Sequence, residues 1–167
     1  MGYWGYLVAT KSDVPLDQLA ELATFGEDYV RVEPLHDGWQ LAWVAGANVD
    51  PLVGAELLAK ATGHPVLAAF ILDSDCGPVA AATPDGLTWS GTLAKSMAIN
   101  SYEMPDDGIT QTAAVDSFLT WTTTAGLPTN QPLVTQALSP DATAPEHLLT
   151  LLLQSTGIAP LPHDGQS

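Results

Sequence analysis

The spacing of apolar and polar residues changes along the chain and predicts strands and helices in alternation. Residues 3–10, YWGYLVAT, are rich in aromatic and β-branched side chains and predict a strand. Residues 12–26 then place Leu16, Leu19 and Leu22 at helical spacing, behind a Ser-Asp N-cap and a proline in the first turn. This second stretch predicts an amphipathic helix.

The next part of the chain predicts a hairpin, a helix and a buried strand. Residues 29–33 and 39–46 flank the turn sequence HDG, which predicts a β-hairpin. Residues 49–63 predict a helix that begins after Asp50 and ends at a glycine. Residues 65–72, PVLAAFIL, are apolar throughout, which is typical of a central strand covered on both faces.

The second half of the chain predicts short strands followed by helices. Residues 79–86 and 87–93 are bounded by turn signals and predict a second hairpin and a further strand. Residues 94–110 show no periodicity and predict a long loop. Three helices are expected after it, at residues 113–126, after Asn130 and at residues 143–157. Thr143 and Glu146 fit a capping box at the start of the last helix.

These elements predict an α+β fold with a mostly antiparallel sheet and helices stacked on one face. The sheet is built from two αββ units after an N-terminal strand, and C-terminal helices follow. Each unit has a glycine at its helix end, Gly26 and Gly63, and then a strand, a turn and a strand. The expected parts are an αββ-repeat core at residues 1–93, an irregular loop at 94–111, a helical part packed on the core at 112–157 and a tail at 158–167.

Charge narrows the range of partners. The 167 residues include 19 Asp and Glu but only 4 Lys and Arg, which gives a formal net charge of -15. Such a field repels phosphate backbones and anionic lipid headgroups, because both are bound by Lys and Arg. We therefore expect neither nucleic acid nor a membrane surface as a partner, and we favour a basic protein. A role of the charge in solubility alone stays open, as does the oligomeric state.

The single cysteine and the apolar runs indicate the setting of the protein. Cys76 has no partner for an internal disulfide, and no Cys/His pattern suggests zinc. No apolar run approaches the ~18 residues of a membrane span, and the N-terminus lacks the basic region of a signal peptide. We expect a cytoplasmic protein without a cofactor.

The segment DSDC, residues 73–76, is the main candidate for chemistry because it ends a buried strand. Asp suits turns, since its side chain bonds to nearby backbone and tolerates positive φ. A hairpin turn is therefore the favoured role of Asp73 and Asp75, in the place that Asp37 has in the first unit. A metal site that adds His36 and Asp37 to these two aspartates would require the two hairpin tips to be adjacent.

The stretch FILDSDCGPV resembles the first motif of the haloacid-dehalogenase-like hydrolases, in which an apolar strand delivers two aspartates. The resemblance implies that Asp73 attacks the substrate and that Asp75 protonates the leaving group. It also implies a lysine that steadies the charge and carboxylates that hold magnesium. Lys95 and the pair Asp106 and Asp107 are in suitable order for these roles.

Aromatic residues on the predicted strands supply either core packing or a recognition surface. Trp4 and Tyr6 share one face of the first strand, and Trp39 begins a later strand. An exposed aromatic set surrounded by carboxylates would suit recognition of a basic protein. The candidate binding residues are Trp4, Tyr6, Trp39, Asp37, Asp73 and Asp75.

The chain as a whole resembles a group of small acidic proteins from high-GC Gram-positive bacteria, the actinobacteria. The residues that carry this resemblance are MGYWGY at 1–6, LDSDC at 72–76 and TPDG at 83–86. It implies common descent and a cytoplasmic setting. The charge and the strand aromatics favour a non-enzymatic acidic binding protein, in the manner of an immunity or inhibitor protein for a cationic toxin. The alternative is a magnesium-dependent phosphohydrolase with Asp73 and Asp75 in its active site.

Overall fold

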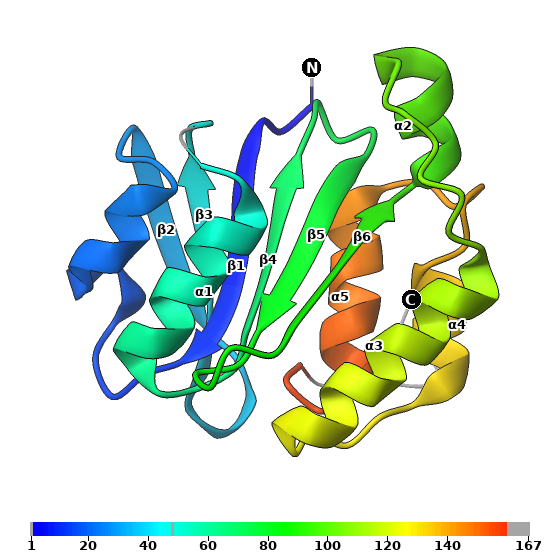
Figure 1. Ribbon diagram of the computed structural model, residues 1–167. Helices are drawn as coiled ribbons and strands as arrows, with labels where there is room; N and C mark the ends of the chain where they lie inside the picture. Colours follow the sequence, from blue (N-terminus) through cyan, green and yellow to red (C-terminus); the bar gives the residue numbers. More distant parts are fainter. Residues whose placement is uncertain (1, 48, 160–167) are drawn as a thin grey trace, which may run out of the picture.

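The structure is a computed structural model that describes residues 2–47 and 49–159. Its centre is a six-stranded antiparallel sheet with the strand order β2-β3-β1-β4-β5-β6 (Figure 1). The strands are β1 Gly5–Lys11, β2 Tyr29–Pro34, β3 Trp39–Ala45, β4 Val66–Ile71, β5 Gly77–Ala82 and β6 Thr88–Leu93. The predicted α+β class is confirmed, with an antiparallel sheet and C-terminal helices.

Short 3₁₀ helices and longer α-helices join and cover the strands within the described residues. The 3₁₀ helices are η1 Leu16–Gln18, η2 Ala20–Thr24 and η3 His36–Gly38. The α-helices are α1 Pro51–Thr62, α2 Lys95–Tyr102, α3 Gln111–Ala125, α4 Gln131–Ala137 and α5 Pro145–Ser155.

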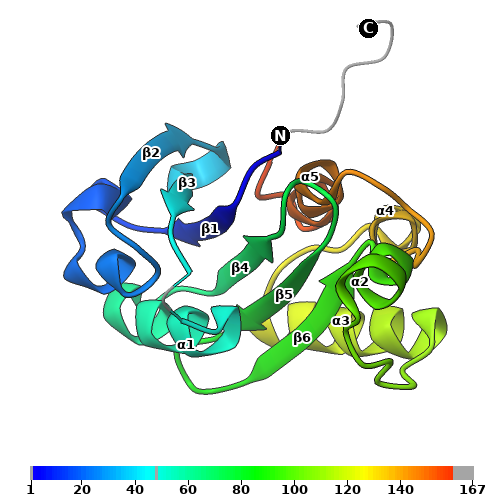
Figure 2. The same cartoon turned by 90° about the horizontal axis from the view of Figure 1, so that it is seen from above.

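Helices cover both faces of the sheet, and two separate cores result. Tyr6 and Val8 of β1 pack in the core beneath η2 and α1. Leu7 and Ala9, which alternate with them, pack in the core beneath the C-terminal helices. Figure 2 shows α1 and α5 on opposite sides of the sheet. The expectation that the helices cover one face is wrong, because β1 and β4 are apolar at successive positions and need cover on both sides.

The first four strands have a split β-α-β topology that occurs twice. β1 and β2 are parallel with β3 between them, and β3 and β4 are parallel with β1 between them. The first crossover is η1 with η2, the second is α1, and both pack on the same face. This β-α-β-β-α-β order is the ferredoxin-like arrangement. β5 and β6 then extend the sheet beyond β4.

Helix α1 forms where the sequence signals place it. The Asp50 carboxylate accepts a hydrogen bond of 2.8 Å from the Leu52 backbone N–H, and Pro51 occupies the first turn. Gly63 ends the helix with φ 72°, a left-handed conformation that glycine adopts without strain. Leu58 is fully buried against the sheet.

Residues 12–26 form two 3₁₀ helices, so the predicted amphipathic α-helix is wrong. η1 and η2 meet at Leu19, whose extended backbone with φ -89° and ψ 124° interrupts the helical path. Gln40 of β3 binds the backbone there: its Oε1 accepts from the Leu16 N–H at 2.9 Å, and its Nε2 donates to the Val14 carbonyl at 3.0 Å. The Gln40 side chain from the sheet therefore forms hydrogen bonds with backbone groups that would bond within the segment if it were an α-helix.

The expected irregular loop at residues 94–111 contains helix α2. The helix lies between Ala94 and Glu103, which both have φ 54°. Ala98 is its single buried residue. Met97 and Tyr102 pack against the core while only partly buried, so the helix has no continuous apolar stripe that its sequence could reveal.

The start of the last helix and the residues that follow the helix also differ from the predictions. Ala144, with φ 64°, occupies the N-cap of α5, and no side chain caps the helix there. Glu146 instead bonds to Ser74 in the turn after β4. Ile158 and Ala159, expected in a frayed tail, are buried at 1% and 7% exposure. The rest of that tail lies outside the described residues.

Candidate functional site

Residues 73–76 lie in the predicted hairpin turn between β4 and β5. The backbone N–H of Asp75 donates to the Leu72 carbonyl at 2.9 Å, and the Leu72 N–H donates to the Cys76 carbonyl at 2.9 Å. Asp73 and Ser74 have positive φ values of 51° and 56°. Two such residues in succession reverse the chain tightly, and Asp tolerates this conformation better than most side chains.

The N-terminal segment docks onto this turn. The Gly2 N–H donates to Asp73 Oδ1 at 2.7 Å, and the Tyr3 N–H donates to Ser74 Oγ at 2.7 Å. The Ser74 N–H donates in return to the Tyr3 carbonyl at 3.0 Å. A Cβ atom at position 2 would lie 2.3 Å from the Asp73 carbonyl oxygen, so the contact requires glycine. The segments at residues 2–3 and 73–74, far apart in the sequence, thus bind each other.

Two side chains from the C-terminal half complete the contacts of the turn. Ser74 Oγ donates to Glu146 Oε2 at 2.5 Å, and the Tyr102 hydroxyl donates to Asp75 Oδ2 at 2.7 Å. The bond to Asp75 raises the pKa of Tyr102 to about 12, because the carboxylate stabilises the protonated phenol. We call this set the N-terminal clasp: Gly2, Tyr3, Asp73, Ser74, Asp75, Tyr102 and Glu146.

Cys76 follows the clasp and is fully buried. Burial raises the pKa of its thiol to about 11, and the nearby Asp75 carboxylate acts in the same direction. A nucleophilic cysteine needs a lowered pKa and access to solvent. Cys76 is therefore a core side chain.

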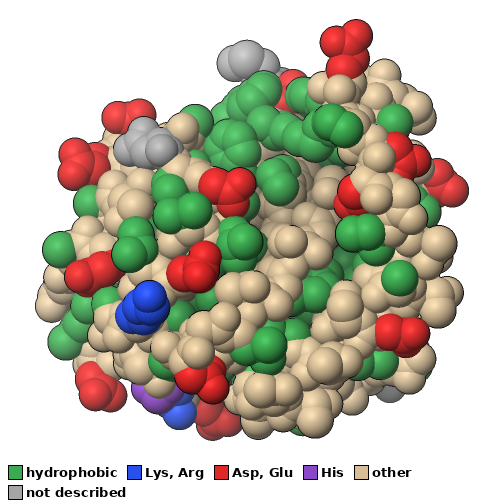
Figure 3. Space-filling view, viewed as in Figure 1, with side chains coloured by type: hydrophobic (Ala, Val, Ile, Leu, Met, Phe, Trp, Pro, Cys, Tyr) green, Lys and Arg blue, Asp and Glu red, His purple; other side chains and the backbone are tan. Residues whose placement is uncertain are grey.

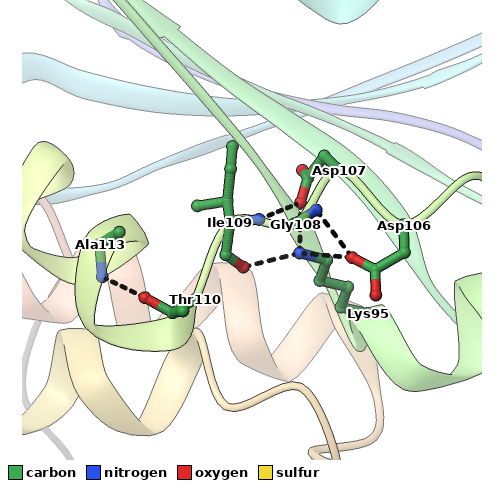
Figure 4. Close-up of polar contacts among 7 residues, drawn as sticks. All are labelled: Lys95, Asp106, Asp107, Gly108, Ile109, Thr110 and Ala113. Carbon is green, nitrogen blue, oxygen red and sulfur yellow. Dashed lines mark hydrogen bonds and ion pairs between the residues drawn. The ribbon is translucent and has the colours of Figure 1, made fainter.

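Lys95, Asp106 and Asp107 form a second polar cluster, between the start of α2 and the loop before α3 (Figure 4). Lys95 Nζ lies 2.5 Å from Asp107 Oδ1 and 3.8 Å from Asp106 Oδ1. It also donates to the Ile109 carbonyl at 2.9 Å. The hydrogen bond from Lys95 lowers the pKa of Asp107. The ammonium thus anchors the loop that leads into α3.

The structure does not bring the residues of the phosphohydrolase hypothesis together as a metal site. Across residues 2–47 and 49–159, no three His, Cys, Asp or Glu side chains are arranged to hold a metal ion. Asp73 and Asp75 belong to the N-terminal clasp. Lys95 binds Asp106 and Asp107 in the other cluster.

The two hairpin tips lie at opposite ends of the sheet. Lys11 pairs with Trp39, so the turn with His36 and Asp37 is at the C-terminal end of β1. Gly5 pairs with Ile71, so the turn at 73–76 is at the N-terminal end of β1. A site shared by the two tips is therefore not formed, and Asp37 is exposed and separate from the clasp.

The aromatic residues expected in one recognition surface are divided between core and surface. Tyr6 and Trp39 are buried, with exposures of 1% and 7%. Trp4 is exposed at 52%. The expectation of a patch with Trp4, Tyr6 and Trp39 is wrong, because the residue alternation of a strand does not tell which faces the helices cover. Tyr29, on the edge strand β2, is exposed at 56% and is the aromatic surface residue that the sequence reasoning missed.

Two hollows border the edge strand β6. A cavity of about 380 Å³ lies between β6, α2 and the start of α3, and one of about 270 Å³ lies between β6, β5 and the start of α1. The two cavities share five lining residues, which come from β6 and from the loop before α3, so the cavities lie on either side of this strand and loop. We call this region the β6 groove, with the shared lining Ser90, Gly91, Thr92, Asp107 and Ile109. Ser90 and Thr92 carried no signal in the sequence beyond a predicted strand.

Comparisons with protein-family models, with curated proteins and with solved structures find no match to this chain. Within the part of the chain that the structure describes, none of the helices combines the length and the apolar character needed to cross a membrane.

Proposed function

We propose that this chain is a non-enzymatic acidic binding protein that docks to a basic partner protein, as an immunity or inhibitor protein does. The observation that carries the proposal is that few carboxylates of the described residues lie beside a cation. Within the described residues, Lys95 forms both of the ion pairs, with Asp106 and Asp107. No acidic residue there is buried, so the net charge of -15 acts outward. Such a field steers a cationic partner and speeds its association.

Apolar side chains among the carboxylates also support a protein partner. Val53 and Leu57, one helical turn apart on α1, are exposed at 48% and 44%, and Glu56 lies between them in the sequence. Figure 3 shows acidic and hydrophobic side chains intermingled over this face, with Lys and Arg side chains only at its lower left. A surface of this composition offers apolar contact area as well as attraction for a basic protein.

The bonds of the other candidate residues favour binding over catalysis. Asp73 and Asp75 hold the N-terminal segment and Tyr102, which gives each carboxylate a structural task. Lys95 is occupied by two aspartates and a backbone carbonyl. We also propose that the protein is cytoplasmic and that it is related to the small acidic actinobacterial proteins.

The test is capture of a partner followed by measurements with the purified pair. The immobilised chain is exposed to an actinobacterial extract at about 50 mM and about 500 mM NaCl, and retained proteins are identified. We expect a protein of high isoelectric point whose association rate constant falls roughly ten-fold or more over this range. If the partner is an enzyme, its activity is lost at a one-to-one ratio of the two chains. Failure to retain any basic protein at the lower salt refutes the proposal.

Two exposed positions of opposite charge provide matched control variants. Asp17→Asn removes one negative charge and Lys60→Gln removes one positive charge, and both side chains are exposed. Electrostatic steering predicts slower association with the purified partner for the first variant and faster association for the second. Equal association rates for the two variants contradict the electrostatic basis of the proposal.

A further inference from the structure

Strand β6 has a free outer edge. Within the described residues it pairs with β5 alone, and no other segment forms a backbone hydrogen bond with Thr88–Leu93. The Leu72 N–H donates to the Cys76 carbonyl, so the backbone polar groups of Cys76 point toward β4. These groups alternate in direction from residue to residue along a strand, and those of Val79 therefore point toward β6. Gly91 pairs with Val79, so the residues on either side of Gly91, which are Ser90 and Thr92, direct their N–H and C=O groups outward.

The β6 groove has room for chain on both sides of this edge. Successive side chains of an added strand point to opposite faces of the sheet. One set would enter the cavity of about 380 Å³ on the α2 and α3 side, and the other the cavity of about 270 Å³ on the α1 side. The strand presents only small residues there, Ser90, Gly91 and Thr92, so its own side chains do not fill the space.

The charged residues of the β6 groove favour basic side chains. Asp106 and Asp107 line the larger cavity, and Asp50 and Asp107 line the smaller one. Lys95 is the one basic residue in the lining of the two cavities, and it offsets one of these three carboxylates. An incoming Lys or Arg would therefore meet net negative charge on either side of β6. It would also compete with Lys95 for Asp107, which holds the outer wall of the groove (Figure 4).

The other edge of the sheet is protected and β6 is not. Edge strands avoid unwanted pairing through charged side chains and proline. β2 carries Arg31, Glu33 and Pro34, whereas β6, TWSGTL, carries neither charge nor proline. A second copy of this chain is a poor occupant for the free edge, because each copy brings a charge of -15.

We propose that the β6 groove binds an extended basic segment of a partner protein, which pairs with Ser90 and Thr92 as a seventh strand of the sheet. This inference rests on the proposed function and names the part of the partner that is recognised. Backbone hydrogen bonds to the edge supply the register, and the aspartates on both sides select Lys and Arg.

The test uses synthetic peptides as probes. The blocked hexapeptide (Lys-Thr)₃ is titrated into the full chain at about 50 mM NaCl, alongside (Glu-Thr)₃ and a (Lys-Thr)₃ with N-methyl groups on alternate residues. We expect the basic peptide to bind, and the acidic and N-methylated peptides to bind at least roughly ten-fold more weakly. Equal binding of the N-methylated and unmodified basic peptides refutes strand pairing.

A matched pair of variants at Ser90 separates the contribution of its backbone N–H to peptide binding from that of its side chain. Ser90→Pro removes an outward N–H, which an edge strand tolerates, whereas Ser90→Ala keeps that N–H and removes only the hydroxyl. We expect Ser90→Ala to bind (Lys-Thr)₃ like the original chain and Ser90→Pro to bind at least roughly ten-fold more weakly. Retained binding by folded Ser90→Pro overturns the inference. If Ser90→Pro does not fold, the N-methylated peptide decides.

Further outcomes separate this inference from the proposed function. If Ser90→Pro loses the peptide but holds the captured partner as tightly as the original chain does, the groove is not the docking site and the proposed function stands. If no basic partner is retained by the original chain, the proposed function fails whatever the peptides do. Dimerisation of the chain that Ser90→Pro abolishes, measured by sedimentation, would assign the edge to self-pairing and overturn the inference.

Discussion

Replacement of Ser74 by alanine tests the N-terminal clasp directly. The Ser74 hydroxyl accepts a hydrogen bond of 2.7 Å from the Tyr3 N–H and donates one of 2.5 Å to Glu146. A neutral hydrogen bond contributes about 0.5–1.5 kcal/mol to stability, and one to a charged group about 1.5–3 kcal/mol. Because Tyr3, Ser74 and Glu146 are half-buried, we take values in the lower part of each range. The free energy of unfolding should therefore fall by about 2–3 kcal/mol.

The assay is equilibrium unfolding in urea, followed by tryptophan fluorescence and circular dichroism. The same loss should lower Tm by about 4–12 °C, since each kcal/mol shifts Tm by about 2–4 °C at this chain length. Ser101→Ala, at an exposed position of α2, is the control and should change stability by less than about 0.5 kcal/mol. A double-mutant cycle with Glu146→Gln should give a coupling of about 1 kcal/mol. If Ser74→Ala costs no more than Ser101→Ala, the Ser74 hydroxyl does not hold the N-terminal segment in place.

Three further predictions follow from the pKa shifts and the helix cap. The pKa of Tyr102 is raised from 10.0 to about 12, so its stabilising effect is complete below pH 10 and is lost as the pH rises through 12. Tyr102→Phe should remove this loss from the alkaline stability profile and one late step from the tyrosinate absorbance titration. Cys76, with a pKa raised to about 11 and no exposure, should react with a thiol reagent near neutral pH only as fast as the chain unfolds, which a urea series of labelling rates measures. Asp50→Ala removes the cap of α1 and should cost about 1 kcal/mol in urea unfolding, whereas Asp28→Ala, at an exposed position, serves for comparison.

The fold could be predicted where the signals are local. Asp50, Pro51 and Gly63 define both ends of α1 because capping depends on neighbouring residues. The apolar run of β4 predicts a buried strand because it leaves no polar face. The first helix failed for a non-local reason, since Gln40 from the sheet binds the backbone that the helix would use. Periodicity in one segment cannot reveal a partner from another.

The sequence predicted only part of the candidate sites, because the contacts that complete them join residues far apart in the chain. Asp73 and Asp75 lie in a turn, as the preference of Asp for turns suggests, but their partners Gly2 and Tyr102 are distant in the sequence. The aromatic surface failed because Tyr6 is covered by helices that lie on both faces of the sheet. The free edge of β6 depends on strand order, which no local pattern in TWSGTL encodes.

Because β1 lies in the middle of the sheet, its pairing must wait until later strands have been synthesised. Of the six strands of this sheet β1 is synthesised first, and its two neighbours in the sheet are β3 and β4. Tyr6 pairs with Val44 on one side and Phe70 on the other, so this apolar strand emerges long before either partner exists. Pairings so distant in sequence form slowly, because the chain between them must first close a loop. A nascent chain that ends before β4 therefore leaves one edge of its most buried strand without a partner.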